Sequence, residues 1–200
     1  MGRVDLLSLT SPRQGHFRLE SGHHTNRWLD LEGLFVQPAR VRPFVNRLAR
    51  ALRPHGVAGV CGPLVGGAFL AQTLATALKA EFFFTEHVMP AEREGLYQAE
   101  YRLPRAARAT VRGKRLAIVD DAISAGSAVR GTYAELEAHG AEPAVVGALL
   151  LLGSAASPFF AHRDVPIEAV ARVPFELWAP AECPLCASRV PLEEPQSPVT

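Results

Sequence analysis

The stretch that decides the fold is Leu116-Ala117-Ile118-Val119-Asp120-Asp121-Ala122-Ile123-Ser124-Ala125-Gly126-Ser127-Ala128. Its first four residues are apolar and predict a buried strand that ends in the two acids. Small and hydroxylic residues then predict a turn, and a helix is expected to begin near Ser127. In an open α/β sheet, ligands bind outside the carboxyl ends of the strands, so we expect this turn to lie at a binding site.

The sequence on both sides of this stretch alternates between strand and helix patterns. Short apolar runs bounded by turn residues predict strands at 57–61, 81–85, 144–152 and 167–173. Apolar residues at helical spacing predict helices at 41–52 and 68–78, and another that starts near 127 and ends at 140. This alternation predicts an α/β fold with an open, mainly parallel sheet. Residues 87–112 lack periodicity and predict a long loop, which in a compact domain is usually functional.

The turn after the two acids has the chemistry of an anion site. Backbone N–H groups of a small-residue turn and of a helix N-terminus bind phosphate, and Ser124 and Ser127 add hydroxyl donors. Gly126 lets the backbone approach a phosphate closely. Asp120 and Asp121 would then face ribose hydroxyls and Mg²⁺, which carboxylates bind well. The alternative is a surface turn in which Ser127 only caps the helix.

Composition excludes several other classes of protein. The chain has 200 residues, 48% hydrophobic, which suits one domain with one sizeable core, and its net charge of +1 gives no basic footprint for nucleic acid or a membrane. Neither a P-loop nor a dinucleotide-binding glycine motif is present. The N-terminus lacks a signal-peptide pattern, and the longest apolar run is too short to span a bilayer, so we expect a cytoplasmic protein.

The three cysteines do not suggest a disulfide framework. Cys183 and Cys186 have zinc-like spacing but supply only half of a site, with Cys61 at the end of a predicted strand. His23 and His24 are interpreted as part of a polar loop. We therefore expect no metal that is essential for folding.

The acidic segment resembles the signature with which type I phosphoribosyltransferases bind phosphoribosyl pyrophosphate (PRPP). Most of the chain is similar to the orotate phosphoribosyltransferases: residues 15–30 resemble a segment of the hood over the base, and 61–71 the pyrophosphate loop with its helix. Residues 84–86 lie where a strand enters the flexible loop, and 182–186 resemble a tail of some bacterial members. The resemblance implies helices on both faces of the sheet and a homodimer. It also implies one domain over 1–200, with hood and tail at about 1–35 and 174–200 and a core at about 36–173.

The resemblance also assigns roles to individual residues. Catalysis would rest on Asp120, Asp121 and Arg93. PRPP would be bound by Asp120, Asp121, Ala122, Ile123, Ser124, Ala125, Gly126, Ser127, Ala128, Val65 and Gly66. Base binding would involve Ser21, Gly22, His24, Arg27, Trp28 and Ser124. The cofactor would be Mg²⁺, held near Asp120 and Asp121 largely through PRPP.

The implied reaction transfers ribose 5-phosphate from PRPP to a base, orotate first of all, with release of pyrophosphate. Two departures from the family keep alternatives open. Residues 80–113 contain no lysine, although the family's flexible loop usually carries several, and the stretch Leu151-Leu152-Gly153-Ser154 lacks the arginine that binds the orotate carboxylate. The alternatives are a relative that uses another base and a non-catalytic protein that senses PRPP or a nucleotide. Arg27 or His24 would be substitute cations for the orotate carboxylate.

Overall fold

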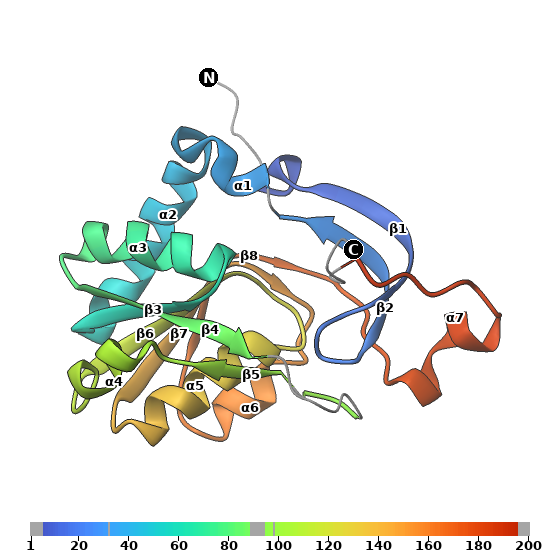
Figure 1. The fold of residues 1–200 in the computed structure, drawn as a ribbon. Coiled ribbons are helices and arrows are strands. Elements are labelled where there is room, and N and C mark those ends of the chain that lie inside the picture. The colour runs from blue at the N-terminus through green and yellow to red at the C-terminus, as the bar shows by residue number, and fades with distance from the viewer. Residues whose placement is uncertain (1–5, 32, 89–94, 98, 196–200) are drawn as a thin grey trace.

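A computed structural model describes residues 6–31, 33–88, 95–97 and 99–195. Its centre is a six-stranded sheet (Figure 1). In spatial order the strands are β5 (Glu100–Arg102), β4 (Glu81–Val88), β3 (Gly59–Pro63), β6 (Arg115–Ile123), β7 (Glu142–Leu152) and β8 (Ile167–Val173). Only β5 runs antiparallel to its neighbour, so the predicted mainly parallel sheet is confirmed.

Helices cover both faces of this sheet, and each face has its own apolar core (Figure 1). One face carries α2 (Pro38–Leu52) and α3 (Gly66–Leu78), and the other carries α5 (Ser127–Ala138) and α6 (Ser157–Ala161). Successive strand residues alternate between the cores: Val60 packs under α2 and α3, and Cys61 under α5. Strands covered on both faces need continuous apolar runs, which is the pattern that the sequence shows.

The strand order creates a crevice between β3 and β6. After β3 the chain crosses to β4 on one side, and it later returns to add β6 on the other side of β3. In sheets of this kind, the carboxyl ends of the strands at such a reversal form the ligand site. The loop after β3 and the acids of β6 therefore meet at this point.

A second, two-stranded sheet lies at one end of the molecule (Figure 1). It is the antiparallel hairpin of β1 (Ser11–Arg18) and β2 (His24–Asp30). The C-terminal residues lie against it, with backbone bridges from His24 to Trp178 and from Phe17 to Glu193. We call residues 11–30 together with 174–193 the hood. The remaining short elements are η1 (Leu6–Leu9), α1 (Gly33–Val36), η2 (Arg53–His55), α4 (Arg105–Thr110), η3 (Pro180–Glu182) and α7 (Pro184–Ala187).

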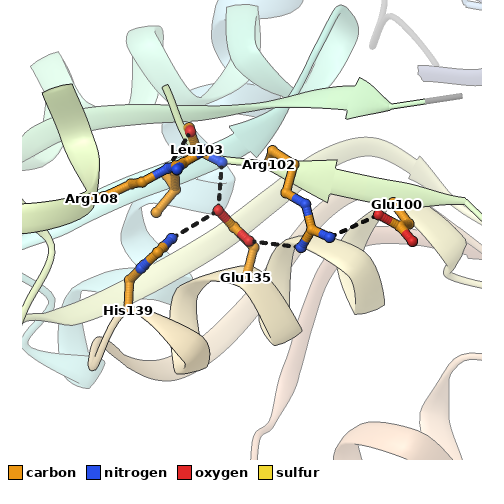
Figure 2. A network of polar contacts seen from close by, with 6 residues as sticks. All are labelled: Glu100, Arg102, Leu103, Arg108, Glu135 and His139. Carbon is orange, nitrogen blue, oxygen red and sulfur yellow. Dashed lines mark hydrogen bonds and ion pairs between the residues drawn. The ribbon is translucent and has the colours of Figure 1, made fainter. Parts of the chain in front are cut away.

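Two of the sequence predictions need correction. Residues 87–112 are not wholly a loop, because β5 and α4 lie within them. Glu135 of α5, which is buried, holds this segment: its carboxylate accepts hydrogen bonds from the backbone N–H of Leu103 (3.0 Å) and from Arg102 (3.1 Å), and it pairs with His139 (Figure 2). Glu135 is far in the sequence from Arg102 and Leu103, so no local sequence pattern predicts these contacts.

The second correction concerns the two acids. The strand does not end at Asp120 and Asp121, as the sequence predicts, but continues to Ile123, which pairs with Leu151 of β7. The long apolar strand β7 provides hydrogen-bonding partners for β6 as far as Ile123. This pairing extends β6 beyond its own apolar residues.

No helix within the described residues is long and apolar enough to cross a membrane.

Candidate active site

A pocket of about 220 Å³ lies at the carboxyl ends of β3 and β6. Five segments supply its walls: the hood turn, Leu31 directly after β2, the loop after β3, strand β5 and the stretch from the end of β6 to the start of α5. Its lining residues are Leu19, Glu20, Ser21, Leu31, Pro63, Leu64, Val65, Gly66, Tyr101, Asp120, Asp121, Ala122, Ile123, Ser124, Gly126, Ser127 and Ala128. The described lining residues include three carboxylates and no lysine or arginine, so no basic side chain of this lining balances the acidic ones.

The acidic pair is arranged by its own backbone. The Asp120 carboxylate accepts a hydrogen bond from the N–H of Asp121 (3.0 Å), and the Asp121 carboxylate accepts one from the N–H of Ala122 (2.7 Å). Burial raises the pKa of Asp120 above its ordinary value, and the neighbouring Asp121 charge raises it further. Burial also raises the pKa of Asp121. Because burial makes the charged form of both carboxyls unfavourable, the pair is suited to bind a cation or hydroxyl donors, which stabilise that form.

A third carboxylate faces the pair. The buried Tyr101 hydroxyl donates to Glu20, with its oxygen 2.9 and 3.0 Å from the two carboxylate oxygens. Burial, Glu20 and Asp120 all raise the pKa of Tyr101, so the phenol keeps its proton. Tyr101 thereby joins the hood to β5, and the carboxylates of three residues border one small space.

The anion turn follows directly on the acids. Gly126 has a left-handed backbone (φ 86°), which favours glycine, and α5 begins at the next residue. The Ser127 hydroxyl lines the pocket, is buried and has no hydrogen-bond partner among the described residues. An unpaired buried hydroxyl at a helix N-terminus is destabilising unless a ligand accepts its hydrogen bond. This observation favours the anion site over the alternative of a helix cap.

The loop after β3 packs directly onto the acids. The N–H of Leu64 bonds to the carbonyl of Thr85, and the peptide bond between Leu64 and Val65 is cis. A Cβ on Gly66 would lie 2.1 Å from an Asp121 carboxylate oxygen, and one on Gly67 would lie 2.8 Å from Asp120. Only glycines allow this approach, which brings the loop and the acids to the same ligand.

Arg130 lies beside the pocket and was not expected from the sequence. It stands one helical turn after Ser127, and its guanidinium donates to the carbonyl of Ala155 (3.0 Å), in the loop where the expected arginine is absent. The guanidinium carbon lies 4.1 Å from the ring centroid of Tyr97 and 4.8 Å from that of Phe159. Its Nε is buried and without a partner in the described part of the chain, and burial lowers the pKa of the side chain.

The predicted base-binding residues separate in the structure. Ser21 and Ser124 line the pocket, and Gly22 lies in the hood turn with a left-handed backbone (φ 80°). His24, Arg27 and Trp28 lie along β2 and are not among the lining residues. His24 is buried rather than in a polar loop, and its ring meets His16 and Cys186. Base binding by these residues stays a prediction.

The predicted PRPP residues come together, since all except Ala125 line the pocket. Arg93 lies outside the described residues. Sequence reasoning missed Glu20, Tyr101 and Arg130. Glu20 had a signal, because it directly precedes Ser21, and Arg130 had one in its spacing of three residues from Ser127. Tyr101 had none, because only the pairing of β5 with β4 brings it to the site.

Comparison with known proteins gives one family, from a family model and from relatives in sequence, and a shared fold from solved structures. The family model described as "phosphoribosyl transferase domain" matches residues 45–168. The orotate phosphoribosyltransferases of Thermotoga petrophila and Carboxydothermus hydrogenoformans are 31% and 32% identical, and each alignment covers 92% of this chain, with 91% and 90% of those proteins. Among solved structures, the orotate phosphoribosyltransferase of Aeropyrum pernix matches 83% of this chain and 89% of its own, with a TM-score of 0.62 at 19% identity.

The fold is also shared with enzymes named for another base. The adenine phosphoribosyltransferase of Leishmania tarentolae matches 84% of this chain and 85% of its own, with a TM-score of 0.63 at 15% identity. Such a likeness concerns the fold alone. With the family model and the relatives together, the chain belongs to the type I phosphoribosyltransferases, a family of pentosyltransferase enzymes.

Proposed function

We propose that this protein transfers ribose 5-phosphate from PRPP to orotate, forming orotidine 5′-phosphate and pyrophosphate. The observation that carries the proposal is the unpaired Ser127 hydroxyl at the start of α5, shortly after the half-buried acids of β6. Phosphate acceptors and ribose donors are the groups that satisfy both features at once. The names of the most similar relatives above supply orotate as the base.

In the reaction, a ring nitrogen of the base gives up its proton to solvent and forms a bond to C1 of the ribose, while the bond from C1 to the pyrophosphate oxygen breaks. The electron pair of that bond leaves with pyrophosphate. We assign the ribose hydroxyls to Asp120 and Asp121, whose charges also face the positive charge that develops at C1. The turn 124–128 and Ser127 hold the 5-phosphate, and the loop at Val65 and Gly66 holds the pyrophosphate. The protein therefore contributes mainly positioning and electrostatic stabilisation.

The acidic wall fits Mg²⁺. Three carboxylates from Glu20, Asp120 and Asp121 border the pocket, and no basic residue among the described lining balances them. Hard oxygen donors of this kind suit Mg²⁺, which keeps few protein ligands and binds phosphate oxygens at the same time. Bound there, Mg²⁺ supplies positive charge for the pyrophosphate.

The measurement that tests the proposal is formation of orotidine 5′-phosphate from orotate and PRPP with Mg²⁺, followed by orotate loss and by pyrophosphate release. Adenine, hypoxanthine and uracil are assayed beside orotate. Turnover with another base but not with orotate would support the first alternative. PRPP binding in calorimetry without turnover on any base would support a non-catalytic sensor.

Arg130 is the residue that we assign to the orotate carboxylate. From α5 its guanidinium donates to the carbonyl of Ala155, beside the stretch that lacks the family's arginine, and its unpaired Nε is a donor for an anion. A hydrogen bond to a charged group contributes about 1.5–3 kcal/mol, so Arg130→Ala should lower kcat/KM for orotate by roughly 10- to 150-fold. The loss should appear in the KM for orotate, with the Kd for PRPP unchanged.

Two variants control this prediction. Arg163→Ala removes a guanidinium that also stacks on Phe159, at 3.8 Å, but that is exposed, so orotate KM should not change. Arg130→Lys keeps the charge but loses the planar fork, so rescue should be partial. An unchanged orotate KM in Arg130→Ala would show that this residue has only a packing role against Tyr97.

We also propose a homodimer in which a second copy covers the face formed by Val36, Val65 and Phe69. These apolar side chains are 75%, 63% and 51% exposed, and the ring of Phe69 lies 5.8 Å from that of Phe35. Exposed apolar clusters of this kind mark interfaces, and Val65 belongs to the pocket as well.

Light scattering at micromolar concentration should give twice the chain mass. Phe69→Glu should give monomers, whereas Leu192→Glu, at an exposed site on the C-terminal segment, should not. A monomeric wild type would contradict the proposal.

A cytoplasmic location and one domain over residues 1–200 complete the proposal. The three cysteines are free, as is usual in a reducing compartment.

A further inference from the structure

A cluster of four soft and nitrogen ligands lies within the hood, outside the pocket. His16 comes from β1 and His24 from β2, while Cys183 directly precedes α7 and Cys186 lies within it, beside this hairpin (Figure 1). Their ligand atoms all lie within 4.8 Å of one another. Three of the residues are buried: His16 is 2%, His24 4% and Cys183 3% exposed.

Four of the six distances between the ligand atoms lie close to the edges of a tetrahedron around zinc. With Zn–N of about 2.0–2.1 Å and Zn–S of about 2.3 Å, two nitrogens stand about 3.3 Å apart and a nitrogen and a sulfur about 3.6 Å. Here the two histidine nitrogens are 3.0 Å apart. The nitrogen–sulfur distances are 3.4 Å from His16 to Cys183, 3.7 Å from His16 to Cys186 and 3.3 Å from His24 to Cys186.

The other ring nitrogen of His16 fixes which atom faces the cluster. His16 Nδ1 lies 2.8 Å from the carbonyl of Val190, an acceptor, so Nδ1 carries the proton and Nε2 presents its lone pair. Metal-bound histidines usually donate their second nitrogen in this way. Nε2 is also the atom that approaches both sulfurs and His24. The ligand atom and its supporting hydrogen bond are thus already in place.

The backbone holds all four residues in position. His24 exchanges two hydrogen bonds with Trp178, and the carbonyl of His16 accepts one from the N–H of Glu193. The cysteines sit on one short turn, in which the N–H of Ala187 bonds to the carbonyl of Cys183. Because residues 184–194 are almost entirely exposed, few apolar contacts fasten this segment, and a metal would be its main anchor.

We propose that His16, His24, Cys183 and Cys186 bind one Zn²⁺ as a closed structural site that fastens the C-terminal segment to the hood. Two thiolates and two neutral imidazoles are a ligand set of structural zinc, and the mixture of sulfur and nitrogen disfavours Mg²⁺ and Ca²⁺. The expectation of no essential metal counted cysteines only, and the two histidines complete the site. The proposed ligand His24 lies three residues after Ser21, so a metal bound there would also support the hood turn that lines the pocket.

The test is metal analysis of protein purified without chelators. About one zinc per chain is expected for wild type, and less than about a tenth for the Cys183→Ser/Cys186→Ser double variant. His162→Ala, which removes an exposed histidine elsewhere, should keep its zinc. Stripping wild type with a chelator should lower its Tm by about 5 °C or more, and returning Zn²⁺ should restore it. Loading the stripped protein with Co²⁺ should give the visible absorption of tetrahedral cobalt–thiolate.

Two results would overturn the proposal. One is wild-type protein that holds no zinc, takes up no Co²⁺ and has the same Tm with and without chelator. The other is a Cys183–Cys186 disulfide, found by intact mass in freshly purified protein, since a disulfide removes both thiolates. If the double variant fails to fold, the stripped wild type still decides, because it needs no substitution. PRPP binding is measured alongside, so that failure of the zinc site stays separate from failure of the proposed activity.

Discussion

Replacing Asp120 and Asp121 together by asparagine should abolish the thermal stabilisation by PRPP with Mg²⁺ and lower kcat/KM by roughly a hundredfold to ten-thousandfold. The reason is that each carboxylate is assigned a charged hydrogen bond to ribose or a contribution to the metal. Two such bonds at about 1.5–3 kcal/mol each amount to about 3–6 kcal/mol. PRPP at about 100 times its Kd should stabilise wild type by about 2.7 kcal/mol, which raises Tm by about 5–10 °C.

The same substitutions should stabilise the ligand-free protein. Burial, together with Asp121, raises the pKa of Asp120 above its ordinary value of 3.8. A raised pKa in the folded state means that this carboxyl favours folding when protonated, and that this contribution is lost as the pH rises through the raised pKa. Without ligand, the Tm of the double variant should therefore exceed that of wild type, by a margin that grows from acid to neutral pH.

The double variant should lose its stabilisation by PRPP and yet have a higher ligand-free Tm than wild type, so one experiment measures two effects of opposite sign. Thermal unfolding is recorded with and without PRPP and Mg²⁺ for wild type, for the double variant and for Asp164→Asn. Asp164 is exposed and has a left-handed backbone (φ 55°) that asparagine tolerates, so its variant should respond as wild type does. A double variant that is still stabilised by PRPP would refute the role given to the acids, and general misfolding would show as a lower ligand-free Tm.

Gly62→Ala should lower the free energy of unfolding by about 1–3 kcal/mol and Tm by about 2–12 °C, with loss of most activity. A Cβ at position 62 would lie 2.0 Å from the carbonyl oxygen of Gly67 and 2.3 Å from its carbonyl carbon. Both are backbone atoms, so relief requires the loop 63–67 to move away from β3. That movement would also separate Gly66 from Asp121, and PRPP would lose one wall of its pocket.

Gly33→Ala is the matched control, because its Cβ would have one neighbour at 4.0 Å and its backbone has no positive φ. It should change Tm little. Denaturant unfolding of both variants gives the free energies, and PRPP titration reports the pocket. A Gly62→Ala protein with wild-type stability and PRPP affinity would mean that the loop tolerates the shift, and that its contact with the acids has no functional weight.

Much of the core and of the candidate pocket at the end of β6 could be predicted from the sequence, because their patterns are local. The apolar runs of β3, β6 and β7 reflect burial on both faces, and the acids, the small-residue turn and the start of α5 are consecutive. Helix periodicity gave α2 and α3 to within a few residues. The extension of β6 through the acids needed the partner strand β7 and had no local pattern.

The remaining parts depend on contacts between distant segments. Tyr101 reaches the pocket because β5 pairs with β4 and Glu135 holds the residues that follow. Arg130 lies three residues after Ser127, a spacing that the sequence shows, but the carbonyl to which it donates, that of Ala155, is 25 residues away. His16 and His24 join the cysteines across 167 and 162 residues, so a search for cysteine spacing alone finds half of the cluster.

The hood combines residues 11–30 with residues 174–193, so it can form only after the second of these segments has been synthesised. The hydrogen bond from His16 to Val190 joins residues 174 apart, whereas the strands between them pair within the central segment. During translation the α/β core can fold while the hairpin of β1 and β2 still waits for its partner, because domains fold as their residues emerge. Residues 178–193 emerge from the ribosome after every strand of the central sheet. The end of β6 and the loop after β3 can therefore be in place before the hood side of the pocket is completed.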